Sequence, residues 1–123
     1  MTDETAPDSN ATDCLFCRFV SGETTPDVVL ETDRSLAFRD IAPQAPTHVL
    51  VIPKAHHATL ADLAAEAPES LVDLGLAVRA VAEQEGLDGG YRTVFNTGEA
   101  ALQSVHHVHA HVLGGRALTW PPG

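Results

Sequence analysis

His106-His107-Val108-His109-Ala110-His111-Val112 is the stretch that decides how this chain is interpreted. Because residues two apart in a strand share a face, a strand here puts imidazoles on one face and apolar side chains on the other. The imidazoles belong to His107, His109 and His111, and the apolar side chains to Val108, Ala110 and Val112. Imidazoles are costly to bury and fill a core poorly, so we expect them to line a cleft while the other face packs on the core. By the same alternation His106 falls outside the row.

Three aligned imidazoles suit two kinds of chemistry. They could bind a metal through neutral nitrogens, as three-histidine zinc sites do. Same-face neighbours on a strand are roughly 6.6–6.8 Å apart at Cα, which makes convergence on one ion awkward. Imidazole is also a nucleophile and an acid–base group that titrates near neutral pH. Shared work on a phosphate needs aligned side chains and no convergence on one point, so the row favours phosphate chemistry.

Short strand patterns and one long helical pattern surround this stretch. Apolar residues recur at helical spacing between Pro68, which suits a first helical turn, and Gly86, which suits a helix end. A shorter helix is predicted over residues 60–65, and a tight turn over residues 32–35. The predicted strands are Val28–Glu31, Leu36–Asp40, Thr47–Pro53, Tyr91–Asn96 and His107–Leu113. The sequence therefore predicts an α+β fold with a five-stranded antiparallel sheet, one main helix and one short helix.

Composition limits the partners that this chain can have. Its 123 residues carry a formal net charge of −10, from 7 Lys and Arg against 17 Asp and Glu. Such a surface repels an extended nucleic acid, although a pocket of backbone amides can still hold one mononucleotide. There is no apolar run of about 20 residues and no secretory signal pattern, so we expect a cytoplasmic protein without a membrane partner. We predict a disordered acidic tail over residues 1–13 and a single domain over residues 14–123.

The two cysteines, Cys14 and Cys17, have C-x-x-C spacing. One disulfide would be unusual in a chain without an export signal, so metal binding or redox chemistry is the better interpretation. A thioredoxin-like motif opens a helix after a strand, whereas this pair follows the predicted tail.

The triad stretch and several further motifs resemble the histidine triad superfamily. His107–Val112 matches the alternating histidine and apolar signature that gives the superfamily its name. Other motifs resemble its nucleoside phosphoramidate hydrolase branch, in order and spacing from Cys14 to Gly123. They are CLFC (14–17), FRDI (38–41), APQAPTH (42–48), VIPK (51–54), QSV (103–105), GGR (114–116) and WPPG (120–123). Two positions depart from the pattern: Leu102 stands where a glycine usually precedes Gln103, and His106 replaces an aromatic residue.

The resemblance implies catalytic and phosphate-binding roles. His109 is the nucleophile that attacks the α-phosphorus of a nucleotide, and His107 stands beside it in the catalytic row. His111 and Ser104 contact the phosphate and the leaving group, and Asn96 contacts the phosphate.

The resemblance also implies a nucleoside site and a dimer. Asp40 holds the ribose hydroxyls, since a carboxylate accepts well from neighbouring hydroxyls. The base pocket consists of Phe16, Phe19, Phe38 and Ile41. The alternative for these four is plain core, and for Phe19 both interpretations stand equally. The smaller members of the superfamily form dimers with a continuous sheet, in which the C-terminal segment reaches the partner's site, so Trp120 is expected there.

The resemblance also implies a structural zinc ion, because some bacterial members of the superfamily hold one with two such cysteines. The ligands carried over are Cys14, Cys17, His48 and His107, a closed set of two thiolates and two imidazoles. The alternative is a pair of buried thiols beside a hydrogen-bonded His48. The adjacent histidines 56 and 57 are expected in a surface loop without a role.

Together these expectations describe a homodimeric purine nucleoside 5′-phosphoramidate hydrolase, similar to an adenosine 5′-monophosphoramidase. It would bind a purine mononucleotide or nucleoside phosphoramidate and work through a covalent nucleotidyl-histidine. Two alternatives remain open. One is a dinucleoside polyphosphate hydrolase or nucleotidyl transferase, and the other is a nucleotide-binding regulatory dimer with little turnover.

Overall fold

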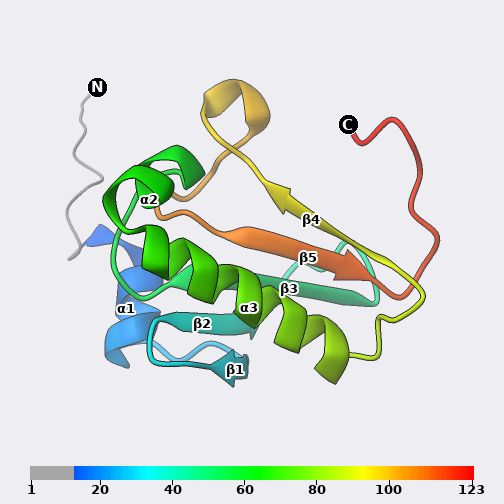
Figure 1. The fold of residues 1–123 in the computed structure, drawn as a ribbon, viewed down its shortest axis with the longest axis horizontal. Coiled ribbons are helices and arrows are strands. Elements are labelled where there is room, and N and C mark those ends of the chain that lie inside the picture. Colours follow the sequence, from blue (N-terminus) through cyan, green and yellow to red (C-terminus); the bar gives the residue numbers. More distant parts are fainter. Residues whose placement is uncertain (1–12) are drawn as a thin grey trace.

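A five-stranded antiparallel sheet forms the middle of the molecule (Figure 1). The computed structural model describes residues 13–123, so all but the last residue of the predicted tail lies outside the described residues. The strands are β1 (Val28–Glu31), β2 (Ser35–Arg39), β3 (Thr47–Pro53), β4 (Tyr91–Phe95) and β5 (Ala110–Gly114). They lie in the order β1-β2-β3-β5-β4, and every pair is antiparallel. The predicted α+β class and five-stranded sheet are confirmed.

Helix α3 (Pro68–Gln84) lies along one face of the sheet and buries the main core (Figure 1). Pro68 starts it as predicted, and Gly86 follows its end with a φ of +70°, a conformation that glycine adopts at little cost. The short helix α2 (Leu60–Glu66) precedes it, with Thr59 as N-cap. The core under α3 contains the apolar residues predicted to face it, Val108, Ala110 and Val112.

The short helix α1 (Leu15–Ser21), which the sequence pattern does not predict, packs at one end of the opposite face of the sheet (Figure 1). Phe16 of α1 joins a second buried cluster with Phe38 and Leu50, whose side chains point away from α3. Cys14 is the N-cap, since its Sγ accepts a hydrogen bond from the Cys17 N–H at 3.4 Å. The histidines that point away from α3 and the two cysteines therefore lie on the side of the sheet opposite the main helix.

The β1–β2 hairpin is held by a predicted turn and fastened to α3. Thr32 N–H donates to the Ser35 carbonyl at 2.9 Å, and Ser35 N–H donates back to Thr32 Oγ1 at 2.9 Å. Both hydroxyls donate to Asp73 Oδ2, at 2.8 Å from Thr32 and 2.7 Å from Ser35. One carboxylate of α3 thus fixes the hairpin against the helix.

The last strand begins later than predicted, at Ala110 instead of His107. Ala110 pairs with Val51. The residues before Ala110 lie outside the sheet, and the Val108 N–H donates to the His57 carbonyl at 2.8 Å instead. The first part of the triad therefore lies in a loop. Val108 still reaches the core, so the predicted division into two faces holds although the strand is shorter.

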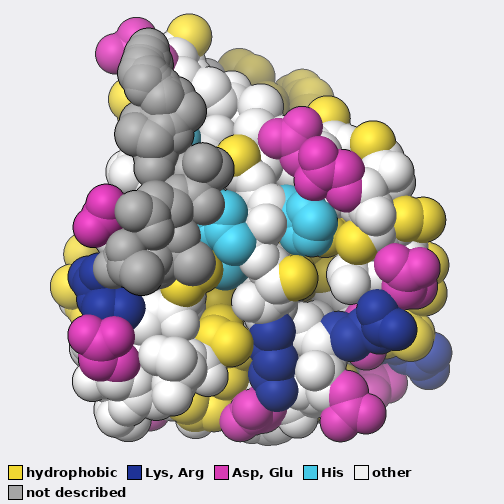
Figure 2. Space-filling model, turned by 90° about the vertical axis from the view of Figure 1, so that its left-hand side faces the viewer, with side chains coloured by type: hydrophobic (Ala, Val, Ile, Leu, Met, Phe, Trp, Pro, Cys, Tyr) yellow, Lys and Arg dark blue, Asp and Glu magenta, His cyan; other side chains and the backbone are white. Residues whose placement is uncertain are grey.

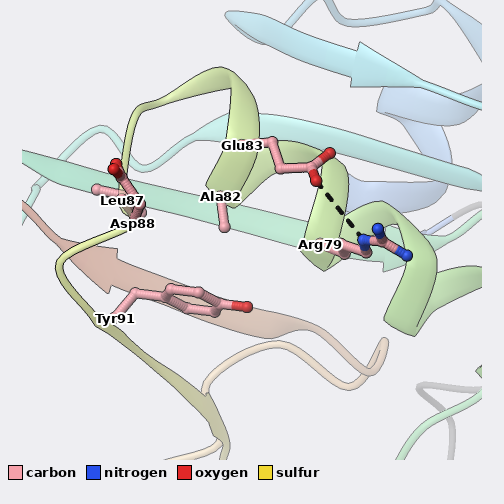
Figure 3. A pocket seen from close by; sticks show the side chains of 6 residues that line it. All are labelled: Arg79, Ala82, Glu83, Leu87, Asp88 and Tyr91. Carbon is pink, nitrogen blue, oxygen red and sulfur yellow. Dashed lines mark ion pairs between the residues drawn. The ribbon is translucent and has the colours of Figure 1, made fainter.

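A pocket of ≈ 400 Å³ lies between the end of α3 and the start of β4, where Arg79 and Glu83 pair above the Tyr91 ring (Figure 3). None of the predicted site residues lines it. Within residues 13–123, no helix has the length and apolar character needed to cross a membrane.

Candidate active site and metal centre

His109 has a hydrogen bond that fixes which of its nitrogens carries the proton. Its Nδ1 lies 2.9 Å from the main-chain carbonyl oxygen of His107. A carbonyl oxygen only accepts, so Nδ1 carries the hydrogen and Nε2 keeps a lone pair in the neutral ring. The ring is 7 % exposed, which leaves one edge accessible while the rest is held by neighbours. The Nε2 of His109 therefore presents a lone pair on the side of the ring away from this hydrogen bond.

His111 is oriented by a chain of hydrogen bonds that starts at the backbone. Gln44 N–H donates to His48 Nδ1 at 3.0 Å, so His48 Nδ1 is an acceptor and its Nε2 carries the hydrogen. His48 Nε2 lies 2.9 Å from His111 Nδ1 and donates to it. His111 Nδ1 is then an acceptor, and the hydrogen of the neutral His111 ring sits on Nε2. The chain turns His111 into an N–H donor beside the lone pair of His109, since the two rings lie 5.0 Å apart.

Asp40 closes the same end of the site. Its Oδ1 accepts from the Ala42 N–H at 2.8 Å, and its Oδ2 lies 3.5 Å from His48 Nε2. The carboxylate is held by these contacts with a fifth of its side chain exposed, which leaves accepting capacity for hydroxyl groups.

Three phenylalanines form a cluster next to His109. Phe16 meets the His109 ring edge-on at 5.2 Å, and it contacts Phe19 at 5.8 Å and Phe38 at 5.3 Å between ring centroids. Phe16 and Phe38 are buried, as a core would have them, and Phe19 is half-buried. Ile41, also predicted for the base pocket, is fully exposed. The structure brings the aromatic residues together and leaves Ile41 apart from the buried cluster.

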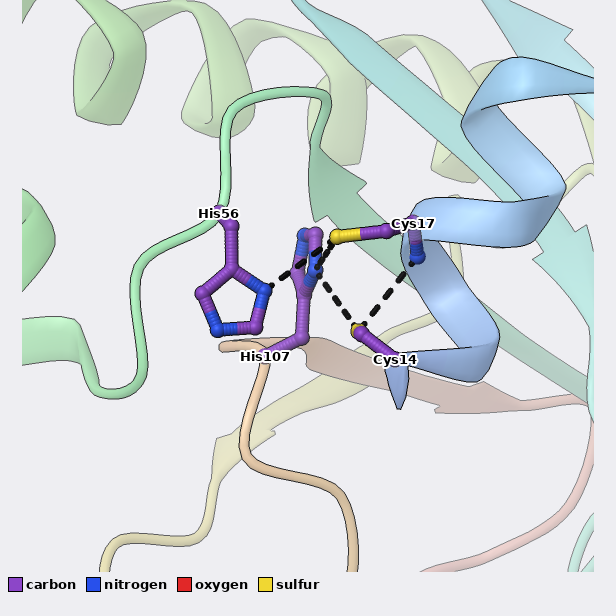
Figure 4. A group of neighbouring side chains, drawn as sticks. All are labelled: Cys14, Cys17, His56 and His107. Carbon is purple, nitrogen blue, oxygen red and sulfur yellow. Dashed lines mark hydrogen bonds between the residues drawn. The ribbon is translucent and has the colours of Figure 1, made fainter. Parts of the chain in front are cut away.

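A second group of side chains meets beside the triad: Cys14, Cys17, His56 and His107 (Figure 4). Their ligand atoms all lie within 4.8 Å of one another. His107 Nδ1 is 3.4 Å from the Cys14 Sγ and 3.5 Å from the Cys17 Sγ, and His56 Nδ1 is 3.2 Å from the Cys17 Sγ. Around a tetrahedral zinc, the usual Zn–S and Zn–N lengths give an S···N separation of about 3.6 Å. The four side chains therefore fit a structural zinc ion.

The ring of His107 is oriented for such a ligand role. Its Nε2 donates to the Pro53 carbonyl at 2.7 Å, so Nδ1 presents a lone pair to the two cysteines. The side chain is fully buried, and burial lowers its pKa to about 4. Burial also raises the pKa of the Cys17 thiol to about 12, because a lone thiolate is poorly solvated there. A bound zinc ion would compensate that charge.

The predicted zinc set needs one correction: the structure places His56 in it, and His48 elsewhere. β3 and β5 are antiparallel with Val51 opposite Ala110 and His48 opposite Leu113. His48 is thus level with a residue six positions beyond His107 and contacts His111 instead. The chain after Pro53 is the part that lies level with His107. The signal that identifies His56 is this register, together with its place three residues after β3 ends.

Residues 21–118 match the model of the HIT domain family. This chain belongs to the HIT domain family. It is 46% identical over 112 residues to a 14 kDa zinc-binding protein of Zea mays. The aligned region covers 89% of this chain and 87% of that one. A HIT family hydrolase from Legionella pneumophila has a similar structure, with a TM-score of 0.86 and 49% identity, covering 90% of this chain and 100% of that one. A histidine triad nucleotide-binding protein from Candida albicans also has a similar structure, with a TM-score of 0.77 and 33% identity. The match covers 89% of this chain and 83% of that one.

In this HIT domain, the site histidines are kept neutral mainly by burial. Loss of solvation lowers the pKa of His48 and of His109, and lowers that of His111 to about 4. Neighbouring imidazoles, His109 and His48, lower the His111 value further. Figure 2 shows histidine side chains at the surface of the end of the HIT domain where α1 and α2 lie, with acidic groups beside one of them.

The remaining predicted residues of this HIT domain lie at its surface. Ser104 is exposed in the loop before the triad, and Asn96 is half-buried just beyond the end of β4. Trp120 is 80% exposed, with the Arg92 guanidinium 5.9 Å from its ring centroid. Arg92 also donates to the Thr119 carbonyl at 2.9 Å, so the C-terminal segment is fastened to β4.

Proposed function

We propose that this protein hydrolyses purine nucleoside 5′-phosphoramidates through a nucleotide covalently attached to His109. The observation that carries the proposal is the His109 Nδ1 to His107 carbonyl hydrogen bond, which leaves Nε2 as a lone pair. The relatives named as a HIT family hydrolase and as a nucleotide-binding protein support the reaction class and the ligand. That the bond cleaved is a P–N bond is our proposal and goes beyond what the names of these relatives say.

The reaction follows from the two oriented imidazoles. His109 Nε2 attacks the α-phosphorus, and the P–N bond to the amine breaks. The departing amine takes up a proton from solvent as the bond breaks, while the His111 Nε2–H and the Ser104 hydroxyl donate hydrogen bonds to it. Water then attacks the phosphorus, releases the nucleotide from His109 and returns one proton to the solvent. Asp40 would hold the ribose and the phenylalanines the base.

The decisive experiment compares two substrates on purified protein. We expect turnover of adenosine 5′-phosphoramidate to AMP and amine, and much slower turnover of a diadenosine polyphosphate. Faster turnover of the polyphosphate would assign the protein to P–O–P chemistry instead. Nucleotide binding without turnover of either compound would make it a regulatory nucleotide-binding protein and overturn the proposal.

We further propose that Cys14, Cys17, His56 and His107 hold one zinc ion. The maize relative named as a zinc-binding protein supports this, as does the tetrahedral spacing of the donors. Zinc there acts as a structural cross-link, since four protein ligands leave no open position. The side chains join α1 and the loop after β3 to the start of the triad. We place the protein in the cytoplasm, where reducing conditions keep the two cysteines out of disulfides and available as metal ligands.

We also propose a homodimer with a continuous sheet. β4 is an edge strand, so one side of its backbone is unpaired within the described chain. Val72 and Leu76 are well exposed on α3, as is Tyr91 at the start of β4, which leaves apolar surface for a partner to cover. Light scattering should give twice the chain mass for the whole protein and for a variant lacking residues 120–123. A monomeric wild-type protein would contradict a site shared between chains.

A further inference from the structure

The loop between β4 and β5 forms a pocket of ≈ 460 Å³ that the proposed reaction does not yet explain. It is lined by Glu99, Leu102, Gln103, Ser104 and His106. All five belong to one short segment, which includes the 3₁₀ turn η3 (Glu99–Ala101). The pocket is therefore shaped by this loop alone, and its residues determine what it can hold.

Gln103 makes the loop rigid from the inside. Its side chain is buried, and its Oε1 accepts from the Gly98 N–H at 3.0 Å. Its Nε2 donates to the Ala58 carbonyl at 2.7 Å and to the Val105 carbonyl at 3.1 Å. With Gln103 anchored inward, the residues on either side of it line the pocket and are exposed. A pocket with a fixed wall loses little conformational entropy when it binds a ligand.

Leu102 is the unusual residue of this wall. It has a φ of +65°, the only positive φ of a non-glycine residue among those described, and its side chain is 81% exposed. A branched apolar residue in the left-handed region is strained. Because the Leu102 side chain is exposed, it also contributes no hydrophobic stabilisation to the folded protein. Glycine would remove both costs. An apolar side chain held in this position is explained if it contacts a ligand.

The charge of the pocket restricts that ligand. Glu99 supplies a carboxylate, and no lysine or arginine is among the described residues that line the pocket. A polyphosphate chain would meet repulsion here, whereas a cation would be attracted. Ser104 and His106 add polar groups at the rim.

The pocket is connected to the proposed reacting site through Ser104 and its neighbour Val105. Ser104, which we assign to the leaving group, lines it. The next residue, Val105, packs on the buried cluster that contains Phe16, and the Phe16 ring meets the His109 ring at 5.2 Å. When Ser104 contacts the leaving group, as we propose, that group lies at the rim of this pocket.

We propose that the pocket binds the side chain of the leaving amine, and that it selects amines with an apolar chain ending in a cationic group. Leu102 contacts the chain and Glu99 attracts the cation. This inference rests on the proposed phosphoramidate hydrolysis and names the class of leaving group for it.

The test uses adenosine 5′-phosphoramidates whose amines differ only at the far end of a butyl chain: methyl, ammonium or carboxylate. Their reacting nitrogens are similar, so differences in kcat/KM report the pocket. The unsubstituted phosphoramidate serves as the reference for the reaction itself. We expect the ammonium compound to exceed the carboxylate compound by about tenfold at low salt, and by less at high salt. Glu99→Gln should remove most of this preference, while the remote Glu83→Gln keeps it.

Leu102 is tested by two variants that separate contact from backbone strain. Leu102→Asn keeps the branched arrangement of side-chain heavy atoms and tolerates the left-handed region, and Leu102→Gly removes the side chain and the strain. Both variants should lower kcat/KM for the methyl-terminated compound by about fivefold and leave kcat/KM for the unsubstituted compound unchanged. Leu102→Gly should be the more stable of the two proteins. Equal rates across the series and the variants would overturn the pocket assignment alone. No turnover of the unsubstituted compound would overturn the proposed function.

Discussion

His107 contacts both the proposed metal centre and the proposed nucleophile, and each contact uses a different atom. Its Nδ1 faces the cysteines, its Nε2 donates to Pro53, and its carbonyl accepts from His109 Nδ1. Any change that moves His107 therefore moves the group that sets the His109 tautomer. A single residue thus links the proposed metal centre to the proposed nucleophile, and we expect substitutions in the metal centre to affect both zinc content and turnover.

The nucleophile itself gives the sharpest prediction at this scale. His109→Ala should lower turnover of adenosine 5′-phosphoramidate by several orders of magnitude, because a covalent mechanism has no substitute for its nucleophile. Binding of AMP should persist, since Asp40 and the phenylalanines remain, and calorimetry measures it. His57→Ala, which removes an imidazole paired with Glu66, serves as the matched control. Near-normal turnover by His109→Ala would refute the mechanism.

His48 is a positioning residue, and its effect should depend on the leaving group. His48→Asn removes the donor to His111 Nδ1, so His111 no longer has one fixed tautomer. We expect kcat to fall by about 10²-fold with an alkylamine leaving group, with KM nearly unchanged. With an aniline leaving group, which needs less help from an acid, the loss should be much smaller. An equal loss for both amines would show that His48 has only a structural role.

At the scale of the elements, the register between β3 and β5 separates what the sequence could predict from what it could not. β3 and β1 have the predicted bounds, because their apolar patterns are strong and local. α1 was missed because seven residues give too little periodicity, and its cap is the Cys14 thiol, which is not a usual capping group. The choice between His48 and His56 depended on register, which a strand pattern alone does not give. The roles of His109 and His111 in turn depend on tautomers, which only the hydrogen bonds define.

Because the proposed metal centre contains His56 and not His48, substitution of these two histidines should have different effects on zinc content. Protein purified without added zinc should contain about one zinc per chain. His56→Ala and Cys17→Ala should lose it and unfold at lower temperature, because metal binding is coupled to folding. His48→Ala should keep its zinc, since His48 lies with Asp40 and His111. Zinc loss from His48→Ala with retention by His56→Ala, measured by elemental analysis, would reverse the assignment.

At the scale of the whole molecule, the buried imidazoles make stability depend on pH. Burial lowers the pKa of His48, and lowers that of His111 from 6.5 to about 4. Between these two pH values the unfolded chain binds protons that the folded chain does not, so the free energy of unfolding rises with pH. The contribution is complete above about pH 6.5 and is lost as pH falls toward 4.

Urea unfolding should therefore show a less stable protein at pH 5 than at pH 7. Zinc release by acid acts in the same direction, so zinc content is measured at each pH and the argument rests on His48 and His111, which are not in the metal centre. Replacing both by asparagine should flatten the dependence, whatever it does to stability at pH 7, because asparagine does not titrate in this range. His106→Asn, at an exposed position, should leave the slope as it is. A double variant with the wild-type slope would show that the acid sensitivity arises from other groups, and that these two rings are not held neutral by the fold.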